Sequence, residues 1–489
     1  MKSIPEFWFE PQPWLNGQSS PANSFVEVRN PATGEMLAKV GLGDTKMLCD
    51  AIEGAVKVQE EWAESSSVER GVILKKAADL LLDRKDEFAR LLTAEQGKPY
   101  AQALGEVHYA ASFFQWFGEE ARRVYGRIAA HPDQGREYLI ESRPVGVVGL
   151  ITPWNFPLAQ GAKKIAAALA AGCCAVWKPS EFTPLIALAL GPLMAEAGLP
   201  MGVLQIVPGY GGELGAALVD HPEVKVISLT GATETGRSVM AAAAGGIKRV
   251  SLELGGNAPF IVLPDADLDQ VVEDLIQLKL LTSGQVCVTA NRVFVHADSE
   301  IVMREKLAEK LADAKIGNGL EDGVDAGPLI HQQACDKVLG LLDAAVASGA
   351  EIVYQNRTYQ ADQSLVKGSF FPPTLLARVS DEMALAREEV FGPIISLISY
   401  SSTTEVIRRA NETPYGLAAY VYGSDLTECR AVASRLEVGI IGVNEWRPLK
   451  AEIPFGGIKQ SGIGVEGGEE GIHEFCDTRV ISLPKPKLV

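Results

Sequence analysis

The sequence lacks the features of a nucleic-acid-binding, membrane-spanning or secreted protein. Its 45 lysines and arginines are outnumbered by 62 aspartates and glutamates, and the resulting net charge of −17 would repel a phosphate backbone. Its apolar runs are shorter than the ~18 residues of a membrane span. Glu6 and Glu10 stand among the N-terminal aromatic residues, which is unlike a signal peptide. These absences predict a cytoplasmic protein without nucleic-acid or membrane partners.

Cysteine and histidine are too scarce and too scattered for a disulfide framework or a zinc site. The chain has 7 cysteines and 6 histidines, and no two cysteines have C-x-x-C spacing. We therefore expect no metal ion, and we expect most cysteines, such as Cys173 and Cys174, to be small buried residues. Cys287 differs because it follows a glycine-containing turn, whose free backbone amides favour a reactive thiolate.

The length of 489 residues suggests about three compact units. Between residues 145 and 254 apolar strands alternate with helices, which predicts an α/β fold with a doubly wound parallel sheet. The expected strands are 145–151, 175–177, 203–207, 224–229 and 249–252, and the expected helices are 157–171, 183–197, 211–219 and 235–244. Helices are also expected within 51–96 and 101–125, and strand-like residues at 138–151. A second α/β alternation from 257 to 456 includes a helix at 268–281, a strand at 292–296 and a helix at 300–314, and the tail has a strand at 478–483.

Several short motifs stand at the carboxyl ends of expected strands, where doubly wound sheets bind ligands. Asn155, in Ile151-Thr152-Pro153-Trp154-Asn155-Phe156-Pro157, has a side-chain amide that can donate two hydrogen bonds. Glu181, in Lys178-Pro179-Ser180-Glu181, can accept from the hydroxyls of a dinucleotide ribose. The segment 231–236 begins and ends with glycine and can bring backbone amides to a pyrophosphate, but it lacks the lysine of a nucleotide-triphosphate loop. Each motif alone is weak.

Taken in order, the motifs resemble those of the non-acylating, NAD(P)-dependent aldehyde dehydrogenase superfamily over nearly the whole chain. Those that carry the resemblance are Pro-Trp-Asn-Phe-Pro, Lys-Pro-Ser-Glu, Gly-Ala-Thr-Glu-Thr-Gly, Glu253-Leu254-Gly255-Gly256, Gly284-Gln285-Val286-Cys287, Glu389-Val390-Phe391-Gly392-Pro393 and Pro454-Phe455-Gly456-Gly457. Residues 117–126 and 456–462 are most similar to the succinate semialdehyde dehydrogenase branch.

The resemblance implies the aldehyde dehydrogenase fold. It divides the chain into a Rossmann-like NAD-binding domain (1–123 and 145–255), an α/β catalytic domain (256–466) and a small β oligomerisation arm (124–144 and 467–489). It also implies a homo-oligomer, either a dimer or a tetramer. Each arm segment holds an apolar strand without an obvious partner in the chain, which agrees with pairing between subunits.

The resemblance also assigns roles to single residues. Cys287 would attack the aldehyde carbon, Asn155 and the Cys287 backbone N–H would hold the oxyanion, and Glu253 would activate water. Lys164 and Glu466 match positions of proton relay. The expected cofactor contacts are Ile151, Thr152, Pro153, Trp154, Lys178, Ser180, Glu181, Gly231, Ala232, Gly236, Leu254, Glu389 and Phe391. Because a carboxylate at Glu181 repels a 2′-phosphate, we expect NAD to be favoured over NADP.

The expected substrate residues depart from the branch. Leu281 and Lys163 stand where the branch has arginines, and Arg447 and Lys450 lie where it has a serine stretch; Phe455 completes this set. The three cations are either solvated rim charges or a rearranged anion site near the tunnel mouth. We expect an acidic aldehyde similar to succinate semialdehyde. The alternatives are a dehydrogenase of neutral or aromatic aldehydes, a CoA-dependent acylating enzyme, against which Glu253 argues, and a non-catalytic protein of the same fold.

Overall fold

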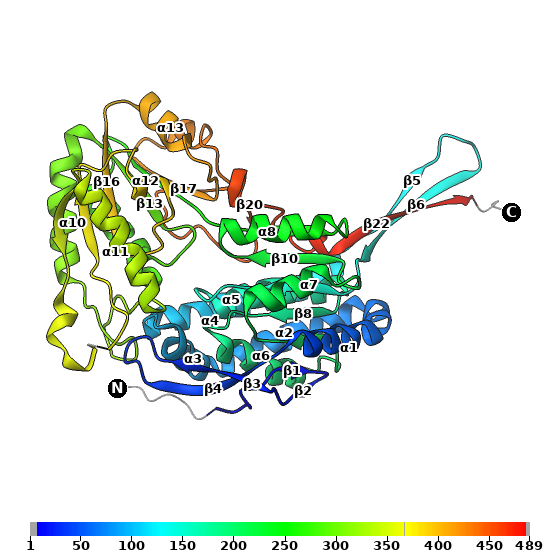
Figure 1. Cartoon of the computed structure of the whole chain (residues 1–489). Coiled ribbons are helices and arrows are strands. Elements are labelled where there is room, and N and C mark those ends of the chain that lie inside the picture. Colours follow the sequence, from blue (N-terminus) through cyan, green and yellow to red (C-terminus); the bar gives the residue numbers. More distant parts are fainter. Residues whose placement is uncertain (1–6, 366, 486–489) are drawn as a thin grey trace.

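The computed structural model describes residues 7–365 and 367–485, and it consists of two layered α/β units and a projecting arm (Figure 1). Residues 1–6 of the expected NAD-binding domain, which include Glu6, and residues 486–489 of the expected arm lie outside the described residues. Within the described part of the chain, no helix is long and apolar enough to cross a membrane.

The first unit is built on a sheet with five parallel strands in the order β9-β8-β7-β10-β11. These are β7 (Val148–Ile151), β8 (Ala175–Lys178), β9 (Leu204–Ile206), β10 (Val226–Thr230) and β11 (Arg249–Glu253). Successive strands add first to one side of β7 and then to the other, so the predicted doubly wound sheet is confirmed. The order reverses between β7 and β10, where such sheets have their ligand crevice. The antiparallel strands β2 (Gln18–Ser19), β1 (Trp14–Leu15) and β20 (Gly462–Ile463) extend the two edges.

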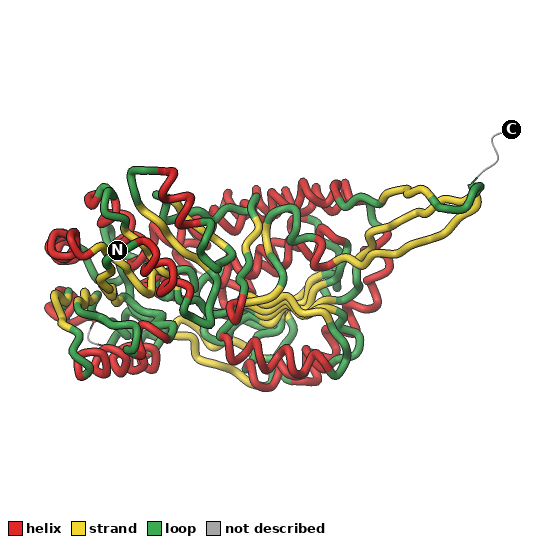
Figure 2. Tube along the Cα trace, turned by 90° about the horizontal axis from the view of Figure 1, so that it is seen from above, coloured by secondary structure: helices red, strands yellow, loops and turns green. Residues whose placement is uncertain are grey.

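Helices cover both faces of this sheet, as the views in Figures 1 and 2 show. They are α1 (Thr45–Glu64), α2 (Ser67–Asp83), α3 (Lys85–Gln96), α4 (Tyr100–Glu120), α5 (Pro157–Ala171), α6 (Pro184–Ala197), α7 (Ala216–Asp220) and α8 (Thr233–Ala244). Every residue of α5 is buried. Pro157 fits its first turn, and Gly172 ends it in the left-handed conformation, so the expected helix at 157–171 is confirmed. A hairpin of β3 (Ser24–Arg29) and β4 (Met36–Leu42) packs nearby.

The second unit has a seven-stranded sheet in the order β14-β15-β16-β13-β12-β17-β18, in which only the edge pair β14–β15 is antiparallel. Its strands are β12 (Ala258–Val262), β13 (Ala290–His296), β14 (Glu351–Gln355), β15 (Thr374–Ala377), β16 (Ile394–Tyr400), β17 (Ala418–Tyr422) and β18 (Ile440–Val443). Its helices are α9 (Leu268–Leu280), α10 (Glu300–Asp313), α11 (Gln332–Ala347), α12 (Ala384–Arg387), α13 (Thr403–Asn411) and α14 (Leu426–Ala433). The expected elements at 268–281, 292–296 and 300–314 are confirmed to within two residues.

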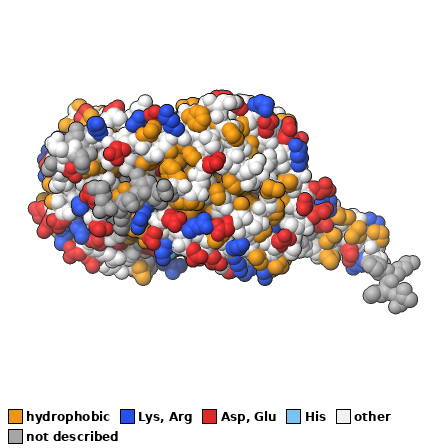
Figure 3. Space-filling view, turned by 90° about the horizontal axis from the view of Figure 1, so that it is seen from below, with side chains coloured by type: hydrophobic (Ala, Val, Ile, Leu, Met, Phe, Trp, Pro, Cys, Tyr) orange, Lys and Arg blue, Asp and Glu red, His pale blue; other side chains and the backbone are white. Residues whose placement is uncertain are grey.

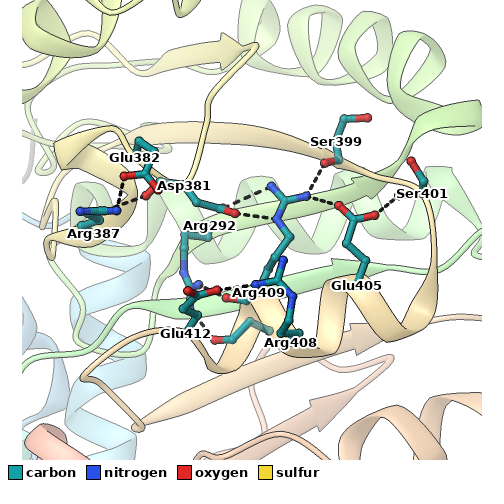
Figure 4. A network of polar contacts seen from close by, with 11 residues as sticks. Arg292, Asp381, Glu382, Arg387, Ser399, Ser401, Glu405, Arg408, Arg409 and Glu412 are labelled. Atoms are coloured by element: carbon teal, nitrogen blue, oxygen red, sulfur yellow. Dashed lines mark hydrogen bonds and ion pairs between the residues drawn. The ribbon is translucent and has the colours of Figure 1, made fainter.

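A network of arginines fastens α13 to this sheet (Figure 4). The Arg409 guanidinium donates to Asp381 at 2.6 Å and to the Ser399 carbonyl at 2.8 Å. The buried Arg292 donates to the carbonyl of Ala410 at 2.8 Å and to the side chain of Asn257 at 2.8 Å. Arg292 therefore ties the end of α13 to Asn257, the residue that directly precedes β12.

The arm consists of β5 (Arg127–Ala130), β6 (Arg136–Pro144) and β22 (Cys476–Pro484). The expectation that its strands have no partner within the chain is wrong, because β6 pairs with both β5 and β22 along their lengths. The open edges belong to β5 and β22, and apolar side chains gather on the arm surface (Figure 3), including the exposed Ile128 and Val480. The arm also starts later than residue 467, since Ile472 and Phe475 are buried in the core of the first unit.

Candidate active site

A left-handed turn places Cys287 beside the gap between the two units. Thr282, Ser283 and Gly284 have φ values of 48°, 54° and 75°, which bend the chain sharply after α9. A Cβ at Gly284 would lie 2.3 Å from the carbonyl oxygen of Gly392, so only glycine fits there. The turn leaves Cys287 half-buried in the wall of a cavity.

The side chain of Gln285 stabilises this turn through two hydrogen bonds to the backbone. It is fully buried, its amide donates to the Thr282 carbonyl at 2.9 Å, and its oxygen accepts from the Ile330 backbone at 2.9 Å.

Burial, followed by the nearby Glu389 carboxylate, raises the pKa of the Cys287 thiol to about 12. The resting side chain is therefore a neutral thiol at pH 7, and forming the thiolate requires a base or an added positive charge.

Asn155 reaches the same turn from the end of β7. Its side-chain amide donates to the Gln285 carbonyl at 2.9 Å, which leaves its second N–H bond free to meet a ligand. Its backbone carbonyl accepts at 2.7 Å from the ammonium of Lys98, on the segment between α3 and α4. The two expected catalytic residues Asn155 and Cys287 are thus joined through one hydrogen bond and two peptide links.

Glu253 ends β11 and is 2% exposed, yet neither of its carboxylate oxygens has a hydrogen-bond partner among the described residues. Burial, followed by the charge of Glu466, raises its pKa well above the ordinary value. A carboxylate in this setting binds a proton strongly, which suits a general base.

Glu466 lies between two lysines of α5. It ion-pairs with Lys163 through one oxygen and with Lys164 through the other, and Lys164 also donates to Ser228 at 2.9 Å. Burial alone would raise the pKa of Glu466, but the two ammonium groups outweigh it and lower the pKa to about 2. Lys163 is therefore a buried partner of Glu466, so for this residue the alternative of a solvated rim charge is wrong.

The cavity has a volume of about 620 Å³ and a mostly apolar wall. Of the expected residues, Cys287, Lys163, Leu281, Arg447 and Phe455 line it. The Lys163 ammonium lies 4.2 Å from the centre of the Phe455 ring. Arg447 is exposed and forms no ion pair with any described residue. The expectation that Lys450 contacts the substrate is not met, because Lys450 is exposed and is not among the described residues that line the cavity.

A first group of expected cofactor residues stands at the carboxyl ends of β7, β8, β10 and β11, on both sides of the point where the strand order reverses. Lys178, at the end of β8, pairs with Glu181 at 3.2 Å, and Glu181 remains partly exposed. Helix α8 begins at Thr233 after Ala232, which supplies no side-chain cap, so its first N–H groups can meet a pyrophosphate. A Cβ at Gly236 would strike Leu254 at 2.5 Å, so this glycine lets α8 approach the end of β11.

A second group of expected cofactor residues lies nearer to Cys287. Glu389 accepts from the Gly256 backbone at 3.0 Å, and burial raises its pKa to about 7. The rings of Phe391 and Trp154 meet edge to face with centroids 5.5 Å apart. The partly exposed Glu181 carboxylate and the uncapped start of α8 are chemically suited to the ribose hydroxyls and the pyrophosphate of a dinucleotide.

Sequence reasoning missed Lys98 and Glu106. Lys98 is 1% and Glu106 2% exposed; they ion-pair at 2.5 Å, and Glu106 also accepts from the first N–H groups of α5. Glu106 stands at an apolar position of the expected helix at 101–125, and this could have indicated a buried charge. Its partner Lys98 lies outside that helix, so the ion pair itself could not be predicted.

The fold and the site define an α/β enzyme with a sheet of the dinucleotide-binding type. Its Cys287 lies in the wall of a cavity, and its buried Glu253 lies at the end of β11. Residues 14–481 match the model of the aldehyde dehydrogenase family, and the chain belongs to that family.

Similar proteins include the glutarate-semialdehyde dehydrogenase of Pseudomonas putida, which is 43% identical over 97% of this chain and 98% of that protein. The succinate-semialdehyde dehydrogenase [NADP(+)] of Escherichia coli is 41% identical, with the same coverage. The crystal structure of succinate-semialdehyde dehydrogenase from Burkholderia pseudomallei is 41% identical, covers 97% of this chain and 98% of its own, and has a TM-score of 0.94.

Proposed function

We propose that this protein oxidises an aldehyde with an anionic group at its far end to the carboxylic acid, with NAD as cofactor. The observation that carries the proposal is a single cavity whose wall holds both the Cys287 thiol and the Arg447 guanidinium, which forms no ion pair with a described residue. Relatives that are named for glutarate and succinate semialdehydes support the same substrate class.

The chemistry follows from the surroundings of each side chain. Glu253, whose charge acts on Cys287, takes the thiol proton, and Cys287 then attacks the aldehyde carbon as a thiolate. The second N–H of Asn155 and the Cys287 backbone N–H stabilise the oxyanion. The bound dinucleotide supplies the acceptor for the hydride that leaves this carbon. Glu253 takes a proton from the water that hydrolyses the resulting thioester. Lys164, whose pKa is lowered by burial and whose ammonium contacts the ionised Glu466, belongs to the path by which the proton leaves the buried site.

The substrate's anionic group meets Arg447 and not Lys163. The charge of Lys163 is already compensated by Glu466, and the fully buried pair would cost several kcal/mol to separate. Arg447 needs no such separation, and its guanidinium can bind a carboxylate through two parallel hydrogen bonds. With Leu281 in the apolar wall, the cavity suits an aliphatic chain between aldehyde and anion.

A comparison of matched aldehydes tests this proposal. We expect kcat/KM for succinate or glutarate semialdehyde to exceed that for butanal or pentanal by tenfold or more, which corresponds to about 1.4 kcal/mol. R447L should remove most of this preference and leave the turnover of the neutral aldehydes unchanged, whereas K450L should change neither. Equal use of acidic and neutral aldehydes by the parent protein would favour the dehydrogenase of neutral aldehydes instead.

NAD is the favoured cofactor because a carboxylate at Glu181 would repel a 2′-phosphate on the adenine ribose. Lys178 compensates part of that charge at 3.2 Å, so NADP is expected to be used more slowly and not to be excluded. The same assays run with both cofactors check this, and an equal or higher kcat/KM for NADP would overturn it. We further infer a cytoplasmic homo-oligomer, a dimer or a tetramer, whose subunits meet through the arm.

A further inference from the structure

We infer that Lys98 and Glu106 are positioning residues that hold the oxyanion donor Asn155 in place, an inference that rests on the proposed role of Asn155. They form a buried ion pair that connects α4 and the segment before it to the loop between β7 and α5. Neither residue needs to touch the reacting atoms for this function.

The first contact fixes the backbone of Asn155. The Lys98 ammonium donates to the Asn155 carbonyl at 2.7 Å, and it lies 3.9 Å from the centre of the neighbouring Phe156 ring. Burial lowers the pKa of Lys98, whereas the Glu106 charge opposes that change. A cation in this position stops the peptide unit of Asn155 from rotating.

The second contact fixes the helix that follows. One oxygen of Glu106 pairs with Lys98 at 2.5 Å, and the other accepts from the backbone N–H groups of Leu158 and Ala159 at 3.0 and 3.2 Å. These N–H groups have no partner within α5, so the carboxylate caps the helix and interacts with its positive end. Glu106 thereby fixes the first turn of α5, which directly follows the loop that carries Asn155.

The third contact defines where the Asn155 side chain points. Its amide is held by the Gln285 carbonyl at 2.9 Å, while Lys98 holds the backbone of the same residue. With both ends restrained, the free N–H bond has one direction. An oxyanion donor stabilises charge only when it is already aligned, and an error of about 1 Å can cost about 100-fold in rate.

A double-mutant cycle tests this inference in the full-length enzyme. We expect K98M to lower kcat by about 10- to 100-fold with little change in KM for NAD, because the cofactor crevice is not altered. In an N155A background, K98M should lower kcat by less than about threefold, because the residue that it positions is already gone. K98R keeps a buried donor and should recover part of the activity, which also guards against a K98M variant that fails to fold.

Glu95 offers a matched control for Glu106. It is an equally buried carboxylate that caps α6 through the N–H groups of Leu185 and Ile186, at 2.6 and 2.9 Å, and it forms no ion pair with a described residue. E106Q should lower kcat strongly, and E95Q should leave it within about twofold. If K98M reduces kcat by the same factor with and without Asn155, or if E95Q and E106Q are equally impaired, the inference is wrong. If N155A itself keeps full activity, the proposed role of Asn155 fails first.

Discussion

At the scale of single residues, the two buried glutamates of the site differ in whether a neighbouring positive charge compensates them. Glu253 has no partner for either oxygen among the described residues, whereas Glu466 has two ammonium groups. The same burial therefore raises the pKa of one glutamate and leaves that of the other low. Two carboxylates with opposite proton affinities are the arrangement that lets one act as a base while the other stays ionised.

The thiol of Cys287 gives a prediction at this scale. Because burial raises its pKa to about 12, its thiolate fraction should increase tenfold per pH unit through pH 9 in the cofactor-free enzyme. The rate of alkylation of the Cys287 peptide by iodoacetamide, followed by mass spectrometry, should rise without a plateau up to pH 10. Free glutathione is the control, and its rate should level off near its ordinary pKa of about 8.5. A plateau of the Cys287 rate below pH 9 would contradict the expected shift.

At the scale of elements, Gly284 connects backbone geometry to the site. We expect G284A to lower kcat at least 100-fold, because its Cβ would meet the Gly392 carbonyl and push the Cys287 turn out of place. G349A is a matched control, since Gly349 also has a positive φ of 101° but has open space around its Cβ position. It should lower stability by about 1 kcal/mol and retain kcat. Thermal unfolding and steady-state assays check both variants, and an active G284A would refute the expectation.

Sequence patterns predicted the regular elements better than the contacts between them. The strands and helices around α5 follow from apolar periodicity, and the end of α5 at Gly172 follows from the glycine itself. The motifs also predicted which strand ends carry Asn155 and Glu253. Periodicity could not predict that Lys163 turns inward to Glu466, because that pairing depends on β21 (Glu466–Gly467) lying against β19 (Pro454–Phe455), far along the chain. Lys98 and Glu106 were missed for the same reason, because their contacts join the segment before α4, α4 itself, and the loop that leads into α5.

At the scale of the whole molecule, the arm projects away from the two α/β units (Figure 1). Ile128 on β5 is 70% exposed, and β5 and β22 leave their outer edges open. Because unpaired strand edges with apolar side chains favour association, we expect I128D to reduce the size of the oligomer. I301D is the control, since Ile301 on α10 is 71% exposed and lies away from the arm. Sedimentation velocity compares the two, and an unchanged assembly in I128D would remove the arm from the interface.

The C-terminal segment has a consequence for biosynthesis. After the second sheet is complete, the chain returns to pair β20 with β11 beside Glu253, delivers Glu466 to the two lysines of α5, and ends as β22 in the arm. These contacts join a segment that is synthesised late to segments that were made much earlier. A nascent chain can therefore fold both sheets while its site still lacks one carboxylate and one neighbouring strand. Catalytic competence therefore arrives only after residues 462–484 have been made, so a chain that is released before them can be folded and still be inactive.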